Sequence, residues 1–104
     1  MSEELTFMVL PKQKEDSAYT WINISRNSTM IGKARVIPKN STLVICSINI
    51  FPEFERRGYA RATIDAFKKE YKVLIADRVR FTAVSFWVKM GFKDDGDGCY
   101  SFEK

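Results

Sequence analysis

The stretch TLVICSINIFPEFERRGYARATIDAF, residues 42–67, places a strong strand pattern directly before the start of a helix. Residues 42–51 are rich in β-branched side chains, which favour a strand. From residue 57 to residue 71, apolar side chains recur at helical spacing and charged side chains take the other side, which predicts an amphipathic helix. We expect this helix to connect neighbouring strands of one sheet through a right-handed crossover.

The predicted strand over residues 42–51 changes character along one of its two faces. Alternation places four apolar side chains on one face, namely Val44, Cys46, Ile48 and Ile50. The other face begins apolar and then becomes polar, in the order Leu43, Ile45, Ser47 and Asn49. A strand whose face turns polar towards its carboxyl end either opens onto a ligand, as in open α/β sheets, or simply reaches solvent.

The rest of the chain is predicted to form short strands, turns and one more helix. Strands are predicted over residues 5–10, 18–24, 29–38, 72–77 and 99–103. A second helix is indicated by Ala83, Phe86, Trp87 and Met90, with Thr82 as its N-cap and Gly91 at its end. QKEDS (residues 13–17) leaves no room for a helix, and DDGDG (residues 94–98) is predicted as a turn. The order β-β-β-β-α-β-α-β predicts one α+β domain over residues 1–104, of mixed α/β plan, with a mostly antiparallel sheet.

Composition argues against several classes of protein. No apolar run approaches the roughly 18 residues of a membrane-spanning helix, and no secretory signal pattern opens the chain, so we expect a cytoplasmic protein. The two cysteines lack CxxC spacing and the chain has no histidine, which predicts reduced thiols and no metal site, with Cys46 in the core rather than a nucleophile. Seventeen Lys and Arg against thirteen Asp and Glu give a net charge of +4, which favours anionic partners such as a phosphorylated cofactor, nucleic acid or an acidic protein surface.

The hexamer ERRGYA predicts an anion-binding loop at the start of the first helix. A helix N-terminus presents unpaired N–H groups and a partial positive charge, and glycine lets the backbone approach a ligand closely. Gly58 removes the side chain that would block a phosphate, while Arg56, Arg57 and Arg61 add long-range attraction.

Two motifs in this part of the chain fit a known pattern. The first is the apolar strand, the step Pro52-Glu53-Phe54 and a loop similar to R/QxxGxG/A, in which Gly58 and Ala60 match and Glu55 stands at the first position. The second is AVSFWVKMGF, which is similar to AxxFYxKxGF and matches at Ala83, Phe86, Lys89, Gly91 and Phe92. Together, over about half the chain from residue 43 to residue 92, they resemble the GNAT superfamily of acyl-CoA-dependent N-acetyltransferases.

The resemblance implies a GNAT fold with a splayed pair of strands, binding of acetyl-CoA, and transfer of its acetyl group to an amine. The pyrophosphate would be held by backbone N–H groups of residues 56–61, and the pantetheine arm would lie along residues 48–50, where that strand splays from residues 72–77. The residues expected to bind the cofactor are Ile48, Asn49, Ile50, Arg56, Arg57, Gly58, Tyr59, Ala60, Arg61 and Phe86. A strand N–H would stabilise the oxyanion.

The catalytic groups match the family pattern less fully. Trp87 stands where the family often has a tyrosine that protonates the departing thiolate, and an indole N–H cannot serve as an acid near neutral pH. Tyr59 and Tyr100 are candidates to replace this acid, and Trp87 is expected in the core. A base must also take a proton from the incoming amine. Glu53 and Glu55 are the carboxylates nearest in sequence to the strand over residues 42–51 and are the candidates for this base, although loop glutamates that are only solvated explain the same residues.

The resemblance is to small members of the superfamily that lack the helical pair between the first two strands. In larger relatives that segment helps to form the acceptor pocket. A second subunit, as in a homodimer, or a macromolecular substrate would then complete the site, and a protein or peptide amine is the expected acceptor.

Two other functions stay open at this point. A CoA-binding module that has lost its chemistry and regulates a partner would keep the same loop, and Glu55 and Trp87 favour it. Nucleic-acid binding by a basic, aromatic-rich surface would use Arg26, Lys33, Arg35, Lys39 and Trp21, although a solvated sheet face explains the same residues.

Overall fold

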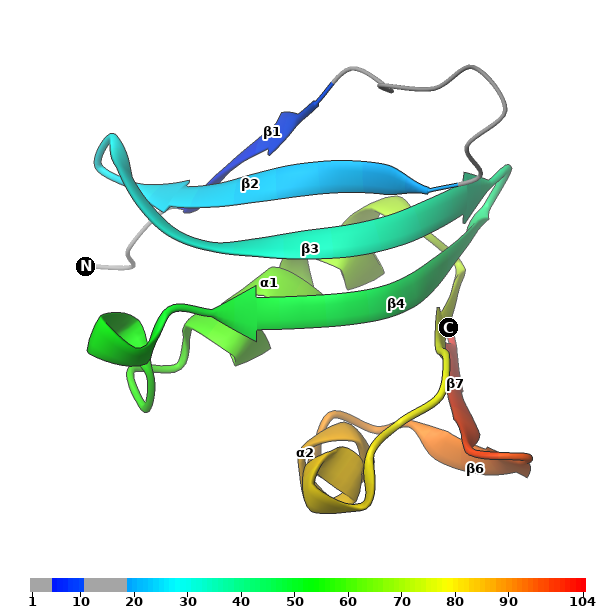
Figure 1. Cartoon of the computed structure of the whole chain (residues 1–104). Coiled ribbons are helices and arrows are strands. Elements are labelled where there is room, and N and C mark those ends of the chain that lie inside the picture. Colours follow the sequence, from blue (N-terminus) through cyan, green and yellow to red (C-terminus); the bar gives the residue numbers. More distant parts are fainter. Residues whose placement is uncertain (1–4, 11–18) are drawn as a thin grey trace.

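A computed structural model of the chain describes residues 5–10 and 19–104. Within these residues the strands are β1 (Leu5–Val9), β2 (Thr20–Arg26), β3 (Thr29–Lys39), β4 (Thr42–Ile50), β5 (Val73–Ala76), β6 (Lys93–Gly96) and β7 (Cys99–Glu103). The α-helices are α1 (Tyr59–Glu70) and α2 (Val84–Lys89), and short 3₁₀ turns, η1 (Pro52–Phe54) and η2 (Phe81–Ala83), precede them. The strands form one sheet in the order β1-β2-β3-β4-β5-β7-β6 (Figure 1).

The sheet is antiparallel at every pairing except that of β4 with β5, which is parallel. Helix α1 connects these two strands, because a parallel pair needs a crossover rather than a hairpin. The predicted α+β fold is therefore confirmed for the described residues, and the predicted order holds except that a further strand, β6, stands between α2 and β7.

Helix α1 covers one face of the sheet and closes the core. Its apolar stripe buries Ile64 and Phe67 against the sheet, where the fully buried side chains include Ile24, Val36 and Leu43. In Figure 1 the helix lies behind β1 to β4, and the opposite face of these strands is turned to the viewer. Burial of these aliphatic side chains, at about 1.5–3 kcal/mol each, is the main stabilising contribution to this half of the molecule.

Strands β4 and β5 pair over a short distance and then separate. Thr42 to Ile45 lie opposite Val73 to Ala76, and the N–H of Asp77 donates one last hydrogen bond to the carbonyl of Ile45 at 3.0 Å. Strand β4 continues to Ile50 without β5 beside it. The predicted splayed pair is confirmed, and it leaves an edge of β4, residues 46–50, whose backbone has no strand partner on that side within the described chain.

A bulge in β4 corrects the predicted faces of this strand. Arg35 lies opposite Ser47 while Val36 lies opposite Ile45, so Cys46 is an extra residue in the ladder. The bulge reverses the alternation beyond Cys46, and Ile48 and Ile50 therefore continue the core face. The prediction that Ser47 and Asn49 share the face of Leu43 and Ile45 was wrong; both are exposed on the other face.

Two local predictions near the C-terminus were also wrong. Residues within DDGDG are not all turn: Lys93–Gly96 forms strand β6, which pairs with β7, and the reversal is confined to residues 97 and 98. Thr82 is not the N-cap of α2, because it lies inside η2 and the helix begins after Ala83 with no side-chain cap. Gly91 does follow the helix with a positive φ of 91°. The predicted QKEDS connection lies outside the described residues.

Lys68 links the two helices. Its Nζ donates a hydrogen bond to the carbonyl of Met90 at the end of α2 and lies 4.1 Å from the ring centroid of Phe102. A cation at a helix C-terminus is favourable, and a charge-assisted hydrogen bond contributes about 1.5–3 kcal/mol.

We therefore predict that Lys68→Met, which keeps the aliphatic stem, lowers the melting temperature by about 4 °C or more. Thermal unfolding followed by circular dichroism measures this change. The matched control is Lys69→Met, since Lys69 is the exposed neighbour on the same helix. Equal effects of the two substitutions would show that the contact with Met90 does not matter for stability.

Candidate active site

The loop between β4 and α1 is held in a fixed path that exposes the start of the helix. The N–H of Phe51 donates to the carbonyl of Ile31 at 2.8 Å, and Pro52 begins the turn η1. Arg56 and Gly58 then adopt positive φ angles of 63° and 81°. These two left-handed residues turn the chain back so that α1 starts at Tyr59.

The first turn of α1 presents unpaired donors. The first helical hydrogen bond runs from the N–H of Ala62 to the carbonyl of Gly58, at 3.0 Å. The N–H groups of residues 59–61 precede it and have no carbonyl one turn earlier in the helix. Gly58 caps this end, and an added Cβ there would meet no atom within 4 Å, so the backbone faces open space. The arrangement suits an anion.

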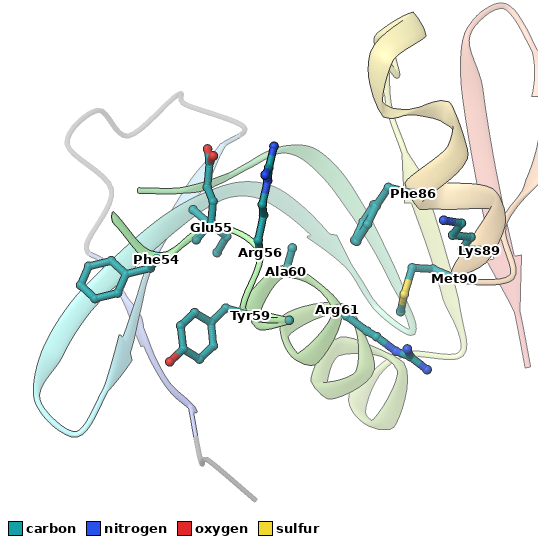
Figure 2. Close-up of a pocket in the computed structure, with 11 residues that line it drawn as sticks. Phe54, Glu55, Arg56, Tyr59, Ala60, Arg61, Phe86, Lys89 and Met90 are labelled. Atoms are coloured by element: carbon teal, nitrogen blue, oxygen red, sulfur yellow. The ribbon is translucent and has the colours of Figure 1, made fainter. Parts of the chain in front are cut away.

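A cavity of about 570 Å³ lies in front of this helix end (Figure 2). Its lining consists of Ile50, Phe54, Glu55, Arg56, Gly58, Tyr59, Ala60, Arg61, Phe86, Lys89 and Met90. Figure 2 shows Phe86 and Met90 reaching from the α2 side towards the first turn of α1. Three cations and one carboxylate stand among otherwise apolar groups, so the cavity combines an apolar interior with a positive balance of charge.

Most of the residues predicted to bind a cofactor line this one cavity. They are Ile50, Arg56, Gly58, Tyr59, Ala60, Arg61 and Phe86. Ile48, Asn49 and Arg57 are not among the lining residues; Ile48 packs against the core, and the bulge at Cys46 turns Asn49 to the other face of the sheet. Arg57 is exposed on the loop.

The predicted catalytic residues are not gathered in one place. Glu55 lines the cavity, whereas Glu53 is exposed on η1 and Tyr100 lies on β7, opposite Ala76 of β5. Trp87 is buried, with 8% of its surface exposed, and its ring packs edge-on against Phe92 with ring centroids 4.8 Å apart. The expectation that Trp87 lies in the core is confirmed.

Three residues at or near the site, Lys89, Met90 and Asp77, were not among the site residues predicted from the sequence. Lys89 and Met90 line the cavity from α2, although both belong to the quoted motif AVSFWVKMGF. Asp77 follows β5 at the point where β5 leaves β4, and its Oδ1 accepts a hydrogen bond from the Sγ of Cys99 at 3.4 Å. Only the register of β4 with β5 reveals that position, because the sequence alone does not show where the two strands separate.

The environment of the Cys46 thiol does not favour a role as a nucleophile. Burial raises the pKa of the Cys46 thiol above its ordinary value, the Arg35 guanidinium lowers the pKa, and the Asp77 carboxylate raises the pKa. The thiol is therefore protonated at neutral pH and is a poor nucleophile. Both cysteines are free.

The described residues contain neither a metal-binding cluster nor a membrane-spanning helix. Over residues 5–10 and 19–104, His, Cys, Asp and Glu side chains form no group of three or more that is able to hold a metal ion. Over the same ranges, no helix has the length and apolar character needed to cross a membrane.

Comparison with known proteins gives consistent matches. Residues 2–92 match the Acetyltransferase (GNAT) family. A curated relative, the uncharacterized N-acetyltransferase YlbP of Bacillus subtilis (strain 168), is 35% identical over 51 residues, which are 49% of this chain and 31% of that protein. The chain therefore matches about a third of the length of this relative.

Solved structures share the fold at low sequence identity. The NMR structure of the Escherichia coli putative N-acetyltransferase YhhK bound to coenzyme A has a TM-score of 0.75 and 14% identity, covering 97% of this chain and 99% of that one. A GNAT acetyltransferase of Elizabethkingia anophelis with acetyl-CoA bound has a TM-score of 0.61 and 14% identity, covering 96% and 98%. The crystal structure of YlbP with coenzyme A has a TM-score of 0.66 and 18% identity, covering 81% and 67%.

The family match spans most of the chain and includes both quoted motifs, and the loop at the start of α1 and the separation of β4 from β5 are in place. The chain belongs to the GNAT acetyltransferase family.

Proposed function

We propose that this protein binds acetyl-CoA in the cavity before α1 and transfers the acetyl group to an amine. The observation that carries the proposal is the helix N-terminus at residues 58–61, which opens onto a cavity of about 570 Å³ with a positive balance of charge. Support also comes from family membership and from the relatives described above that were solved with coenzyme A or acetyl-CoA.

Two parts of the donor molecule, the pyrophosphate and the pantetheine arm, have a matching surface. The unpaired N–H groups of residues 59–61 would hold the pyrophosphate, and Arg56, Arg61 and Lys89 would add charge. The pantetheine arm would extend towards Ile50, where the free edge of β4 offers backbone groups to its amides in the manner of an added strand.

The transfer requires the neutral form of the acceptor amine. Its nitrogen attacks the thioester carbon, the new C–N bond forms, the C–S bond breaks, and the CoA thiolate leaves; the amine proton passes to a base or to water. Glu55 is the described carboxylate that lines the cavity and is our first candidate for the base, ahead of Glu53, while Tyr100 is a candidate for the acid. A thiolate leaving group with a pKa near about 8.5 needs no strong acid, which accommodates a buried Trp87 at the usual tyrosine position.

A non-catalytic CoA-binding module is the second candidate. The burial of Trp87 favours it, because the described cavity then lacks the acid that the family pattern usually places at this position. For either function we propose a cytoplasmic location, since both cysteines are free, as is usual in reducing compartments.

Backbone amide NMR with acetyl-CoA tests the binding step, and release of free CoA with a panel of amines tests the transfer. We predict saturable shifts for residues 54–61 and 86–90, and faster CoA release with a suitable amine. Binding without release for any amine would select the non-catalytic module. An unchanged spectrum at millimolar acetyl-CoA would reject both functions.

A further inference from the structure

The sheet face opposite α1 carries aromatic and cationic side chains in two aligned rows. Strand register places Trp21, Arg35 and Ser47 side by side across β2, β3 and β4. The next row, two residues along each strand, is Asn23, Lys33 and Asn49. We call these six residues the outer face; three strands make it about 10 Å wide.

No described helix covers the outer face. Helix α1 lies on the opposite side of β1 to β4, as Figure 1 shows. Trp21 is 39% exposed and Tyr19, beside it, is 43% exposed, which is unusual for large aromatic side chains on a sheet. Two aromatic rings are therefore accessible on this side of the sheet.

The outer face carries two cations, Lys33 and Arg35, that no carboxylate on the described strands β1 to β4 neutralises. Strands β1 to β4 contain four cations, Arg26, Lys33, Arg35 and Lys39, and no Asp or Glu. Among the described residues, no carboxylate forms an ion pair with Arg35, and its buried Nε has no hydrogen-bond acceptor. An anionic partner would neutralise this half-buried guanidinium from its exposed side.

The cations are already placed over the rings. The Nζ of Lys33 lies 5.1 Å from the Trp21 ring centroid, and the guanidinium carbon of Arg35 lies 4.7 Å from that of Tyr19. A nucleobase would have to displace these cations in order to stack on the rings. Phosphates and carboxylates both bind the cations where they stand, but only nucleic acid also needs the covered rings for stacking, so an acidic peptide fits better than nucleic acid.

Both rows of the outer face end at the free edge of β4. Ser47 and Asn49 belong to the segment of β4 that β5 has left, and Ile50 on the same segment lines the cavity behind the sheet. Asp77 stands where the two strands separate. A segment bound across the outer face therefore reaches the edge along which the proposed acetyl donor lies.

We propose that the outer face is the acceptor site, and that the acceptor is an acidic peptide segment of a protein. Its carboxylates bind Arg35 and Lys33, its backbone crosses β3 and β4, and its amine reaches the free edge of β4 near Asp77. The same charge disfavours polyamines and basic peptides. This inference rests on the proposed acetyl transfer for the role of the amine, whereas binding of the peptide does not depend on it.

The test uses the full chain with CoA present and follows backbone amides by NMR. The probes are two peptides of about eight residues with free amino termini, one rich in Asp and Glu and one with Lys at the same positions, and oligouridine of similar length. We expect the acidic peptide to bind at least about tenfold more tightly than the basic peptide, to shift residues of the outer face, and to weaken as salt rises.

The variant Lys33→Gln/Arg35→Gln should weaken binding of the acidic peptide by about tenfold or more. The control Lys39→Gln changes a cation at the end of β3, away from both rows, and should leave that affinity unchanged. The cofactor titration of both variants should match that of the unchanged protein, since neither position lines the cavity.

Several outcomes would overturn the inference. Equal binding of the two peptides, or acidic-peptide binding that survives the double substitution, would remove the charge argument. Tighter binding of oligouridine would assign the face to nucleic acid. If the double variant does not fold, the peptide comparison and its salt dependence in the unchanged protein decide the question alone. Peptide binding without any cofactor binding would reject the proposed function but keep the outer face as a docking surface.

Discussion

Gly58→Glu is expected to weaken acetyl-CoA binding by at least about a hundredfold while the protein stays folded. Gly58 caps α1 with a φ of 81°, and a side chain added there would meet no protein atom within 4 Å. The glutamate would therefore project into the space in front of the helix N-terminus. Its bulk would occupy the place of the pyrophosphate, and its charge would repel it.

Isothermal titration calorimetry measures the loss, with Gly98→Glu as the matched control. Gly98 also has a positive φ, 79°, and also faces open space, but it lies in the turn between β6 and β7 and does not line the cavity. Both substitutions carry a similar backbone strain of about 1–2 kcal/mol and the same added charge. Normal binding by the Gly58 variant would place the pyrophosphate somewhere else.

Gly32→Ala is expected to destabilise the protein by about 2–3 kcal/mol, the largest stability effect of any methyl-sized change that we predict. A Cβ at Gly32 would lie 2.5 Å from the carbonyl oxygen of Asn49 and 3.0 Å from the Cα of Ile50. Those atoms belong to the backbone of β4, so the clash is relieved only by moving the end of the strand. Cofactor binding should weaken as well, because Ile50 lines the cavity.

Urea unfolding measures the free energy change, and Gly98→Ala provides the comparison. At Gly98 a methyl group meets no neighbour, so only the cost of a positive φ applies, about 1 kcal/mol. If the Gly32→Ala variant is no less stable than Gly98→Ala, the end of β4 can move away from the added methyl group without a loss of stability. The close approach of β3 and β4 would then not be needed to hold the site.

The sequence was sufficient to predict most of the elements and their order because local patterns decide them. Residues 42–67 show strand alternation followed by helical periodicity, and the structure has β4 and α1 in that place. One principle was enough to predict the loop residues that line the cavity: a glycine at the start of a helix leaves backbone N–H groups accessible to a ligand. Gly58 and its neighbours could be found in this way without knowledge of their partners.

The faces of β4 could not be predicted, because a bulge depends on the partner strand. Cys46 is an ordinary strand residue in the sequence, and only its position against Arg35 and Val36 makes it the extra one. Asp77 was missed for a similar reason: its place at the end of the β4–β5 pairing is set by register between residues about thirty positions apart. Strand β6 was missed because all four of its residues are exposed and charged or glycine, which is a turn-like composition.

The short pairing of β4 with β5 also bears on how the molecule opens. Each of the strands β1 to β4 pairs with its neighbour in the sequence over most of its length. In contrast, β5, β7, β6 and α2 are attached to these strands through the four residue pairs of β4 with β5 and through the contacts of α1. Local unfolding follows the weakest seam in a structure, and here that seam runs between β4 and β5. We therefore expect the C-terminal third to detach as a unit at a lower free energy than strands β1 to β4, and we expect a donor molecule bound along this pairing to hold the two parts together and slow amide hydrogen exchange in both.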